Sequence, residues 1–151
     1  MRILMAMAVL SLVACQDEPK KVTGASAPPT ACDIIRVVDG DTVKAICHGR
    51  EENLRLLGFD TPETFRSRCD EEHALGKIAT NHLRKLLREA DEVTPVTGRP
   101  DKYRRLLTRL YIDGRDVAEI MIQAGLAVPY HGERRISWCD RFGVPTTASL
   151  G

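Results

Sequence analysis

The chain has 151 residues, a length that suits one domain with a modest hydrophobic core. Its residues are 43% hydrophobic and 28% charged, the composition of an ordinary globular protein. The formal net charge of +1 excludes bulk charge as a means of holding a polyanion, so any such binding must come from a local patch.

The N-terminal segment has the pattern of an export signal. Arg2 precedes an apolar run at residues 3–14, which is too short to span a bilayer but typical of a signal-peptide core. The last residues of that run, followed by Cys15, resemble a bacterial lipobox, which implies cleavage before Cys15 and lipidation of its sulfur. Two or more acyl chains would anchor the protein to a membrane. The alternative is an ordinary signal peptide cut nearby, which leaves a soluble product.

Residues 16–31 are polar and rich in Pro, Ala and Ser, which predicts a flexible tether. The product is then exported, either as a periplasmic or outer-surface lipoprotein or as a secreted protein. The predicted division of the chain is a signal peptide at 1–14, an anchor and linker at 15–31, a folded domain at 32–139 and a C-terminal tail at 140–151.

The folded part begins with a predicted hairpin at residues 33–46. Two β-branched runs flank Asp39 and Gly40, and Asp-Gly between such runs is the strongest short hairpin signal. If the turn has two residues, Cys32 and Cys47 face each other across the strands. A bulge or an irregular turn would shift this register.

The cysteine count also indicates disulfides. With Cys15 assigned to lipid, four cysteines remain, and an even number in an exported protein favours disulfide pairing. The hairpin register makes Cys32–Cys47 the preferred pair and leaves Cys69 with Cys139. No CxxC or His-Cys spacing indicates zinc.

Residues 53–60 are a predicted third strand, which ends at Pro62. From about residue 72 to residue 90, apolar residues recur at helical spacing and predict one amphipathic helix. Residues 92–96 form a weak strand, and the proline within it favours a sheet edge.

Residues 105–112 predict a better strand, and a turn follows at 113–115. Residues 117–125 predict a short helix with Gly125 as its C-cap, and 126–130 are extended. Three strands, a helix, two strands and a helix fit a mainly β fold with α-helices (α+β). The specific prediction is a small closed barrel, such as an OB-fold, with two packed helices.

Charged residues gather at the predicted strand ends. Each has an ordinary explanation by itself: turn chemistry for Asp39 and Asp41, a strand end for Asp60, and a solvated face for Arg55. In a meander, however, Asp41 and Asp60 are neighbours in space. Two carboxylates held close repel unless a cation lies between them, and hard oxygen ligands favour Ca²⁺ or Mg²⁺. Calcium fits the expected loose oxygen cage better.

Glu63 lies just past Pro62, where it can reach a water beside the metal and act as a general base. The metal would lower the pKa of a bound water. Two arginines, Arg55 and one from the pair Arg104-Arg105, supply planar forks that match phosphate oxygens. Metal, carboxylate base and paired guanidinium groups together predict phosphodiester hydrolysis.

Four stretches then carry a resemblance: "VVDGDTV", "RLLGFDTPE", "DKYRR" and "LYIDGRDVAEIMIQAGLA". In order and spacing they resemble the staphylococcal-nuclease-like (thermonuclease) family, from about Ile34 to Tyr130. The resemblance implies a five-stranded OB-type barrel with helices beside it. It also implies Ca²⁺-dependent cleavage of DNA and RNA, which breaks the P–O5′ bond and leaves 3′-phosphates.

The resemblance assigns roles position by position. It implies that Asp41 and Asp60 are calcium ligands, together with the backbone carbonyl of Thr61, and that Glu63 is the general base. The two arginines that bind the scissile phosphate and stabilise the transition state match Arg55 and Arg105. Residues that contact a second phosphate match Lys102 and Tyr103.

The chain departs from the family pattern at two places. Arg104 stands where the best-known member has a glycine, and a cation there can alter the pocket or add a phosphate contact. After Tyr130 no long amphipathic C-terminal helix follows. A bond between Cys139 and Cys69 would pin this tail in its place.

Two hypotheses follow. The first is an exported, monomeric, calcium-dependent nuclease that acts on DNA and RNA and is held at a membrane if Cys15 is lipidated. The second is a non-catalytic OB-fold module that binds nucleic acid or protein. The complete set of acids and arginines favours the first.

Overall fold

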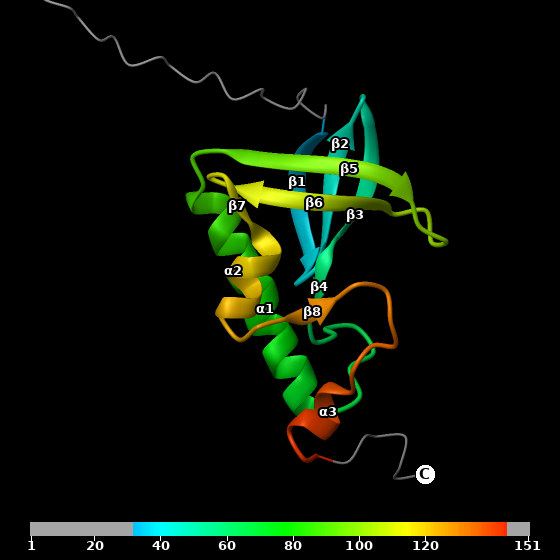
Figure 1. Ribbon diagram of the computed structural model, residues 1–151, viewed down its shortest axis with the longest axis vertical. Coiled ribbons are helices and arrows are strands. Elements are labelled where there is room, and N and C mark those ends of the chain that lie inside the picture. The colour runs from blue at the N-terminus through cyan, green and yellow to red at the C-terminus, as the bar shows by residue number, and fades with distance from the viewer. Residues whose placement is uncertain (1–31, 145–151) are drawn as a thin grey trace, which may run out of the picture.

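The computed structural model describes residues 32–144. The predicted signal peptide, the lipidation site Cys15, the linker and the last residues of the tail lie outside this range. The elements, in chain order, are β1 (Cys32–Asp39), β2 (Thr42–Cys47), β3 (Arg50–Leu56), β4 (Gly58–Asp60), α1 (Asp70–Glu89), β5 (Val93–Pro100), β6 (Leu106–Ile112), β7 (Arg115–Asp116), α2 (Val117–Gln123), β8 (Val128–Tyr130) and α3 (Trp138–Arg141) (Figure 1).

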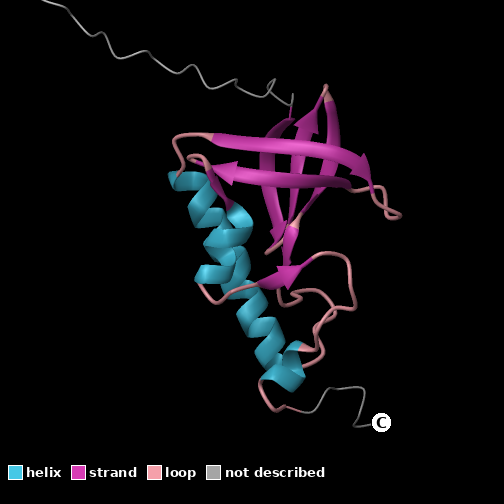
Figure 2. Cartoon of the chain, viewed as in Figure 1, coloured by secondary structure: helices cyan, strands magenta, loops and turns pink. Residues whose placement is uncertain are grey.

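The large sheet has the order β1-β2-β3-β6-β5, and β7 pairs with β6. Strands β3 and β6 run parallel, and the other pairs are antiparallel. Strands β4 and β8 form a separate antiparallel pair. In Figure 2 this small sheet lies between the large sheet and α3. The α+β class and the OB-like strand arrangement are therefore as predicted.

Within the described residues the predicted closed barrel is not formed. Strands β1 and β5 lie at the two ends of the sheet, and no backbone pairing joins them within residues 32–144. Pro95 and Pro100 lie in β5, and a proline has no N–H to donate to a further strand. The edge position predicted from Pro95 is thus correct, while the predicted closure is wrong.

The hairpin turn falls one residue later than predicted, at Gly40–Asp41, because Asp39 pairs with Thr42. Two register shifts then occur in β1, where Ile35 and Val38 are each left without a partner. These two bulges compensate for the later turn and restore the pairing of Cys32 with Cys47. Their sulfur atoms are bonded at 2.04 Å.

The predicted strand at 53–60 is two strands. Strand β3 begins earlier, at Arg50, and Leu57 separates its end from β4. Gly58 follows with a φ of +92°, which allows the chain to turn away from the large sheet. As a result Asp60 pairs with Val128 of β8 and does not continue the strand that contains Arg55.

Helix α1 spans residues 70–89, close to the predicted 72–90, and packs against β1. A Cβ added at Gly76 would meet the carbonyl oxygen of Pro62 at 2.8 Å, so this glycine lets the loop after β4 lie directly on the helix. Helix α2 begins at the N-cap Asp116, whose side chain accepts a hydrogen bond from the backbone of Ala118. Gly125 follows α2 with a φ of +72°, as expected for a C-terminal cap.

Helix α3 was not predicted from the sequence. It is a single turn, and the Cys69–Cys139 bond, at 2.13 Å, joins it to the start of α1. This second disulfide joins the two cysteines that remained once Cys32 was predicted to pair with Cys47. No helix in residues 32–144 combines the length and the hydropathy needed to cross a membrane.

The hydrophobic core lies between the large sheet and the two longer helices. Its members are buried apolar residues of the strands and helices, and the largest fully buried ones are Val43, Leu54, Leu56, Phe59, Leu83, Leu110, Val117 and Met121. Phe59 belongs to β4, so core packing fixes the position of the adjacent Asp60.

Candidate functional site

The turn between β1 and β2 and the end of β4 meet at one place. The backbone amide of Leu56 donates to the carbonyl oxygen of Asp41 at 2.8 Å, which places this turn beside the end of β3. A Cβ added at Gly40 would lie 2.7 Å from Oγ1 of Thr61, so the glycine is needed for the close approach. The turn thereby brings Asp41 to Asp60, although Asp41 lies in a turn of the large sheet and Asp60 lies in the small sheet.

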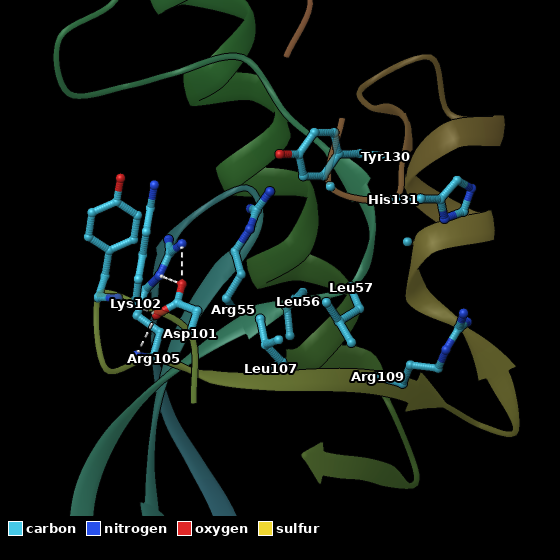
Figure 3. Close-up of a pocket in the computed structure, with 13 residues that line it drawn as sticks. Arg55, Leu56, Leu57, Asp101, Lys102, Arg105, Leu107, Arg109, Tyr130 and His131 are labelled. Atoms are coloured by element: carbon cyan, nitrogen blue, oxygen red, sulfur yellow. Dashed lines mark hydrogen bonds and ion pairs between the residues drawn. The ribbon is translucent and has the colours of Figure 1, made fainter. Parts of the chain in front are cut away.

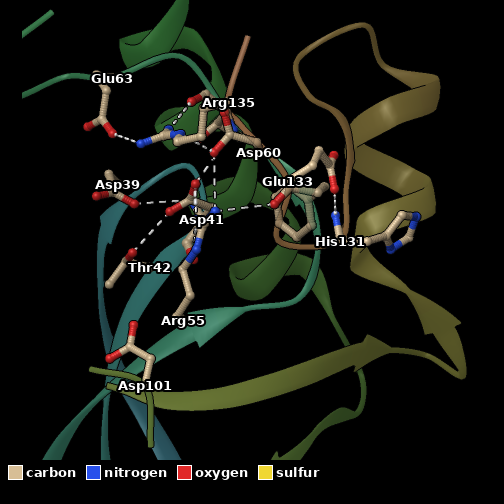
Figure 4. Close-up of polar contacts among 12 residues, drawn as sticks. Asp39, Asp41, Thr42, Arg55, Asp60, Glu63, Asp101, His131, Glu133 and Arg135 are labelled. Carbon is tan, nitrogen blue, oxygen red and sulfur yellow. Dashed lines mark hydrogen bonds and ion pairs between the residues drawn. The ribbon is translucent and has the colours of Figure 1, made fainter. Parts of the chain in front are cut away.

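Arg55 joins the two carboxylates (Figure 4). Its Nη1 atom contacts Oδ2 of Asp41, and its Nη2 atom lies 3.2 Å from Oδ1 of Asp60. All three side chains are buried, with exposed fractions of 10% for Arg55, 8% for Asp41 and 1% for Asp60. Burial lowers the pKa of the Arg55 guanidinium, and the charge of Asp60 opposes that shift.

A second arginine, Arg135, reaches the same acids from the tail. Its Nε atom lies 2.7 Å from Oδ1 of Asp60, its Nη1 atom contacts Oε1 of Glu63, and its Nη2 atom donates to the carbonyl oxygen of Thr61 at 3.2 Å. Burial lowers the pKa of Arg135, but the hydrogen bonds and charges of Asp60 and Glu63 outweigh that effect and raise it. Figure 4 shows this guanidinium between the two carboxylates.

The oxygen atoms at this point fit a hard divalent cation. Oδ2 of Asp60 is buried and has no hydrogen-bond partner in the described part of the chain. A buried acceptor without a partner is costly, and a cation would satisfy it. The carboxylate of Asp41 and the carbonyl oxygen of Thr61 are the other candidate ligands, and calcium prefers this type of donor.

Another cluster, Cys69, Glu72 and Cys139, also has ligand atoms close together. Its two sulfur atoms are bonded to each other, however, so they are not available as thiolates. Glu72 has a different part in the structure. Its carboxylate accepts from the backbone amides of Glu63 at 3.4 Å and of Arg68 at 2.6 Å, so this buried acid holds the loop that contains Glu63 against α1.

The predicted phosphate-binding residues line one pocket of about 570 Å³, drawn in Figure 3. Arg55, Lys102, Tyr103 and Arg105 all line this space. Figure 3 shows Tyr130 across from Lys102 and Arg105. Arg55 lies between the pocket and the acids and thus connects the two groups of predicted site residues.

Asp101 holds Arg105 in position. Its Oδ2 atom accepts from Nε at 2.9 Å and from Nη2 at 2.7 Å of the Arg105 side chain. Its Oδ1 atom accepts from the backbone amides of Tyr103 and Arg105 at 2.8 and 2.9 Å. Arg104, between them, has a φ of +65°, a conformation that favours glycine.

Within residues 32–144 the predicted metal, catalytic and substrate-binding residues meet in one region. Asp41, Asp60, Thr61 and Glu63 contact Arg55 or Arg135, and Arg55, Lys102, Tyr103 and Arg105 line the pocket. Glu72, Asp101 and Arg135 were not predicted from the sequence. A signal for Arg135 existed, because it lies four residues before Cys139, and the predicted bond to Cys69 brings this part of the tail to the loop that contains Glu63.

The chain is similar to known proteins. Residues 53–138 match the family described as staphylococcal nuclease homologue. The chain is 35% identical over 111 residues to the protein named Endonuclease YncB from Bacillus subtilis (strain 168), which covers 71% of this chain and 52% of the relative. It is also 35% identical to SPbeta prophage-derived endonuclease YokF from the same organism, with 71% of this chain and 37% of the relative covered.

A third relative, an "Uncharacterized endonuclease" of Escherichia coli O157:H7, is 30% identical over 98 residues, with 64% of this chain and 59% of the relative covered. The chain therefore spans about half the length, or less, of the two Bacillus subtilis proteins. The matched region contains Arg55, Asp60, Glu63, Arg105 and Arg135.

Proposed function

Because this chain belongs to the staphylococcal nuclease family, we propose that it is a nuclease that uses calcium to hydrolyse phosphodiester bonds in DNA and RNA. The observation that carries the proposal is the shared contact of Arg55 with Asp41 and Asp60, beside a buried oxygen of Asp60 that has no hydrogen-bond partner within residues 32–144. The two Bacillus subtilis relatives are named as endonucleases, which supports the same activity.

The chain's own residues have distinct parts in this reaction. Calcium, when bound by Asp41, Asp60 and the Thr61 carbonyl, would supply positive charge next to the scissile phosphate. The carboxylate of Glu63 accepts a proton from the attacking water, whose oxygen forms a bond to phosphorus. The P–O5′ bond breaks, the leaving oxygen takes up a proton, and the phosphate stays on the 3′ side.

The arginines act on the phosphate. Arg55 and Arg105 line one pocket and present N–H donors to the equatorial oxygens, where negative charge increases in the transition state. Lys102 and Tyr103 contact a second phosphate of the substrate in the same pocket. Asp101 keeps the Arg105 fork in a fixed orientation, which reduces the ordering needed on binding.

The N-terminal sequence extends the proposal to location. Residues 1–14 direct export, and lipidated Cys15 holds a monomeric domain at a membrane through the linker. An exported nuclease works where calcium is more abundant than in cytoplasm and does not reach the cell's own genome.

Digestion of plasmid and single-stranded DNA and of RNA tests the proposal. We expect cleavage with calcium, none with EGTA, and products that a polymerase extends only after a phosphatase removes the 3′-phosphate. Binding of these substrates without cleavage in either buffer would identify a non-catalytic module instead. Cleavage that persists in EGTA would reject the calcium part of the proposal alone.

A further inference from the structure

A second pocket of about 480 Å³ includes Arg135 in its lining. It therefore lies next to the carboxylates of Asp60 and Glu63, which Arg135 contacts. Its lining residues are Arg68, Arg134, Arg135, Ser137 and Asp140, and we name it the arginine pocket. None of them lines the pocket that contains Lys102 and Tyr103. The substrate-binding residues implied by the family resemblance leave this space without a function.

The arginine pocket is built from two loops that are tied together. Arg68 precedes Cys69, Arg134 lies in the segment before Cys139, and the disulfide between these cysteines joins the two segments. The backbone amide of Arg68 also donates to buried Glu72 at 2.6 Å. The bases of the arginine side chains are therefore held near one another before any ligand arrives, which lowers the entropy lost on binding.

The charges in the arginine pocket are unevenly balanced. Arg135 forms ion pairs with Asp60 and Glu63. Across residues 32–144, neither Arg68 nor Arg134 forms an ion pair within 4 Å, and Asp140 is the single acid in the lining. Two guanidinium groups that face a shared space without carboxylate partners match the oxygens of a phosphate group.

The position of the arginine pocket beside Asp60 indicates which ligand it binds. Asp60 contacts both Arg55, which lines the first pocket, and Arg135, which lines the arginine pocket. The acids thus lie between two basic spaces. A nucleic-acid strand whose scissile phosphate reaches Arg55 has a further phosphate available on each side.

We propose that the arginine pocket binds a backbone phosphate of the nucleic-acid strand, on the opposite side of the acids from the phosphate held by Lys102 and Tyr103. Arg68 and Arg134 are the binding residues, and the contact is to phosphate, so it carries no base preference. This inference rests on the proposed function, since it takes nucleic acid as the ligand.

The test is calcium-free binding in EGTA, in which the strand is not cut. The probes are a fluorescent dinucleotide and a strand of about twelve nucleotides, long enough to cover both pockets. The variants are Arg68→Gln, Arg134→Gln and the double variant. Arg88→Gln is the matched control, because Arg88 is exposed and lies in the last turn of α1, away from the α3 end of that helix.

Each single variant should bind the longer strand roughly fivefold more weakly and show a salt dependence (log K against log salt) smaller by about 0.7. Binding of the dinucleotide, and binding by Arg88→Gln, should be unchanged. Arg68→Lys with Arg134→Lys should restore most of the salt dependence, because the charge is kept. Thermal unfolding of each variant checks that the fold is intact.

An unchanged salt dependence for the double variant on the longer strand would overturn the inference. Equal weakening for the dinucleotide would overturn it as well, because the arginines would then act on the first pocket. Failure of the proposed function is a separate result: calcium would give no cleavage, whereas the calcium-free binding comparison would still report on the arginine pocket.

Discussion

The Nε atom of Arg135 lies 2.7 Å from Oδ1 of Asp60, the same carboxylate oxygen that Arg55 contacts from the large sheet. One acid is therefore neutralised from two directions, by a strand and by the tail. The two arginines differ in burial, since the Arg55 side chain is 10% exposed and that of Arg135 is 39% exposed. Moving the Arg135 guanidinium into water therefore costs less free energy than moving that of Arg55.

Replacement of Arg135 by Gln should strengthen calcium binding. The guanidinium contacts Asp60, Glu63 and the Thr61 carbonyl oxygen, so it competes with an ion for the proposed ligands. We expect roughly fivefold tighter binding, the equivalent of one partly exposed ion pair of about 1 kcal/mol. Calorimetric titration with calcium, without nucleic acid, measures this. Arg134→Gln is the control, and equal affinities of wild type and Arg135→Gln would contradict the competition.

Replacement of Arg55 by Gln should destabilise the calcium-free protein by about 3–5 kcal/mol, because it leaves two buried carboxylates without their shared partner. Calcium should restore more stability to this variant than to wild type. Urea unfolding in EGTA and in calcium measures both effects. Exposed Arg36→Gln on β1 is the control and should stay within about 0.5 kcal/mol of wild type. Only a small loss of stability for Arg55→Gln in EGTA would show that the carboxylates of Asp41 and Asp60 do not need this guanidinium.

Replacement of Glu63 by Gln should reduce turnover by about 10²–10⁴-fold, because the amide cannot accept the proton of the attacking water. The fold should persist, since the Glu63 side chain is 37% exposed. Single-turnover cleavage with calcium and thermal unfolding measure the two properties. Glu89→Gln, at the far end of α1, should cleave normally. A near-wild-type rate for Glu63→Gln would show that Glu63 is not the general base.

The Asp101–Arg105 contact should give a defined pH dependence of stability. Burial raises the pKa of Asp101, but hydrogen bonds from Arg105 and from the backbone of Tyr103 outweigh this and lower the pKa. Because the folded protein binds this proton less tightly than the unfolded chain, the stabilisation is complete above the unfolded value of about 3.9. It is lost as the pH falls through the lower folded value.

We therefore expect the stability difference between wild type and Asp101→Asn to be constant near neutral pH and to shrink below about pH 4. Urea unfolding of both proteins across this range measures it, and the subtraction removes the contributions of the other acids. A difference that grows as the pH falls would reverse the assigned direction of the pKa shift.

Replacement of Gly40 by Ala should separate the first hairpin turn from Thr61. The new Cβ would lie 2.7 Å from Oγ1 and 2.9 Å from Cβ of Thr61, whose side chain is buried and cannot withdraw. We expect a loss of about 1–3 kcal/mol and weaker calcium binding, because Asp41 moves with the turn. Gly98→Ala is the control, since its Cβ would meet the Leu107 carbonyl oxygen at 3.4 Å, an ordinary contact. Unchanged stability of Gly40→Ala would refute the close approach.

Local signals in the sequence were sufficient for most elements. Helical spacing of apolar residues gave α1 to within two residues at its start and one at its end, because that pattern depends only on neighbours along the chain. The predicted Cys32–Cys47 pair is present, but for a partly different reason, since two bulges in β1 offset a turn that lies one residue later. A sequence does not reveal bulges that packing produces.

The tertiary structure decided the rest of the sheet. The break at Leu57 and the pairing of β4 with β8 place Asp60 beside the turn that contains Asp41, and they depend on contact between segments far apart in the chain. The same is true of the open edges at β1 and β5, where hydrogen-bond donors and acceptors fail to meet within residues 32–144.

By itself the sequence predicted Asp41, Asp60 and Arg55 as site candidates, because turn and strand-end signals mark such residues locally and the motifs that contain them resemble a known family. Only the tertiary structure revealed Arg135, Glu72 and the arginine pocket. Their positions come from a disulfide and from a buried carboxylate that bind the tail and a loop to one helix. Contacts of this kind join residues whose separation along the chain carries no periodic signal, so folding alone brings them together.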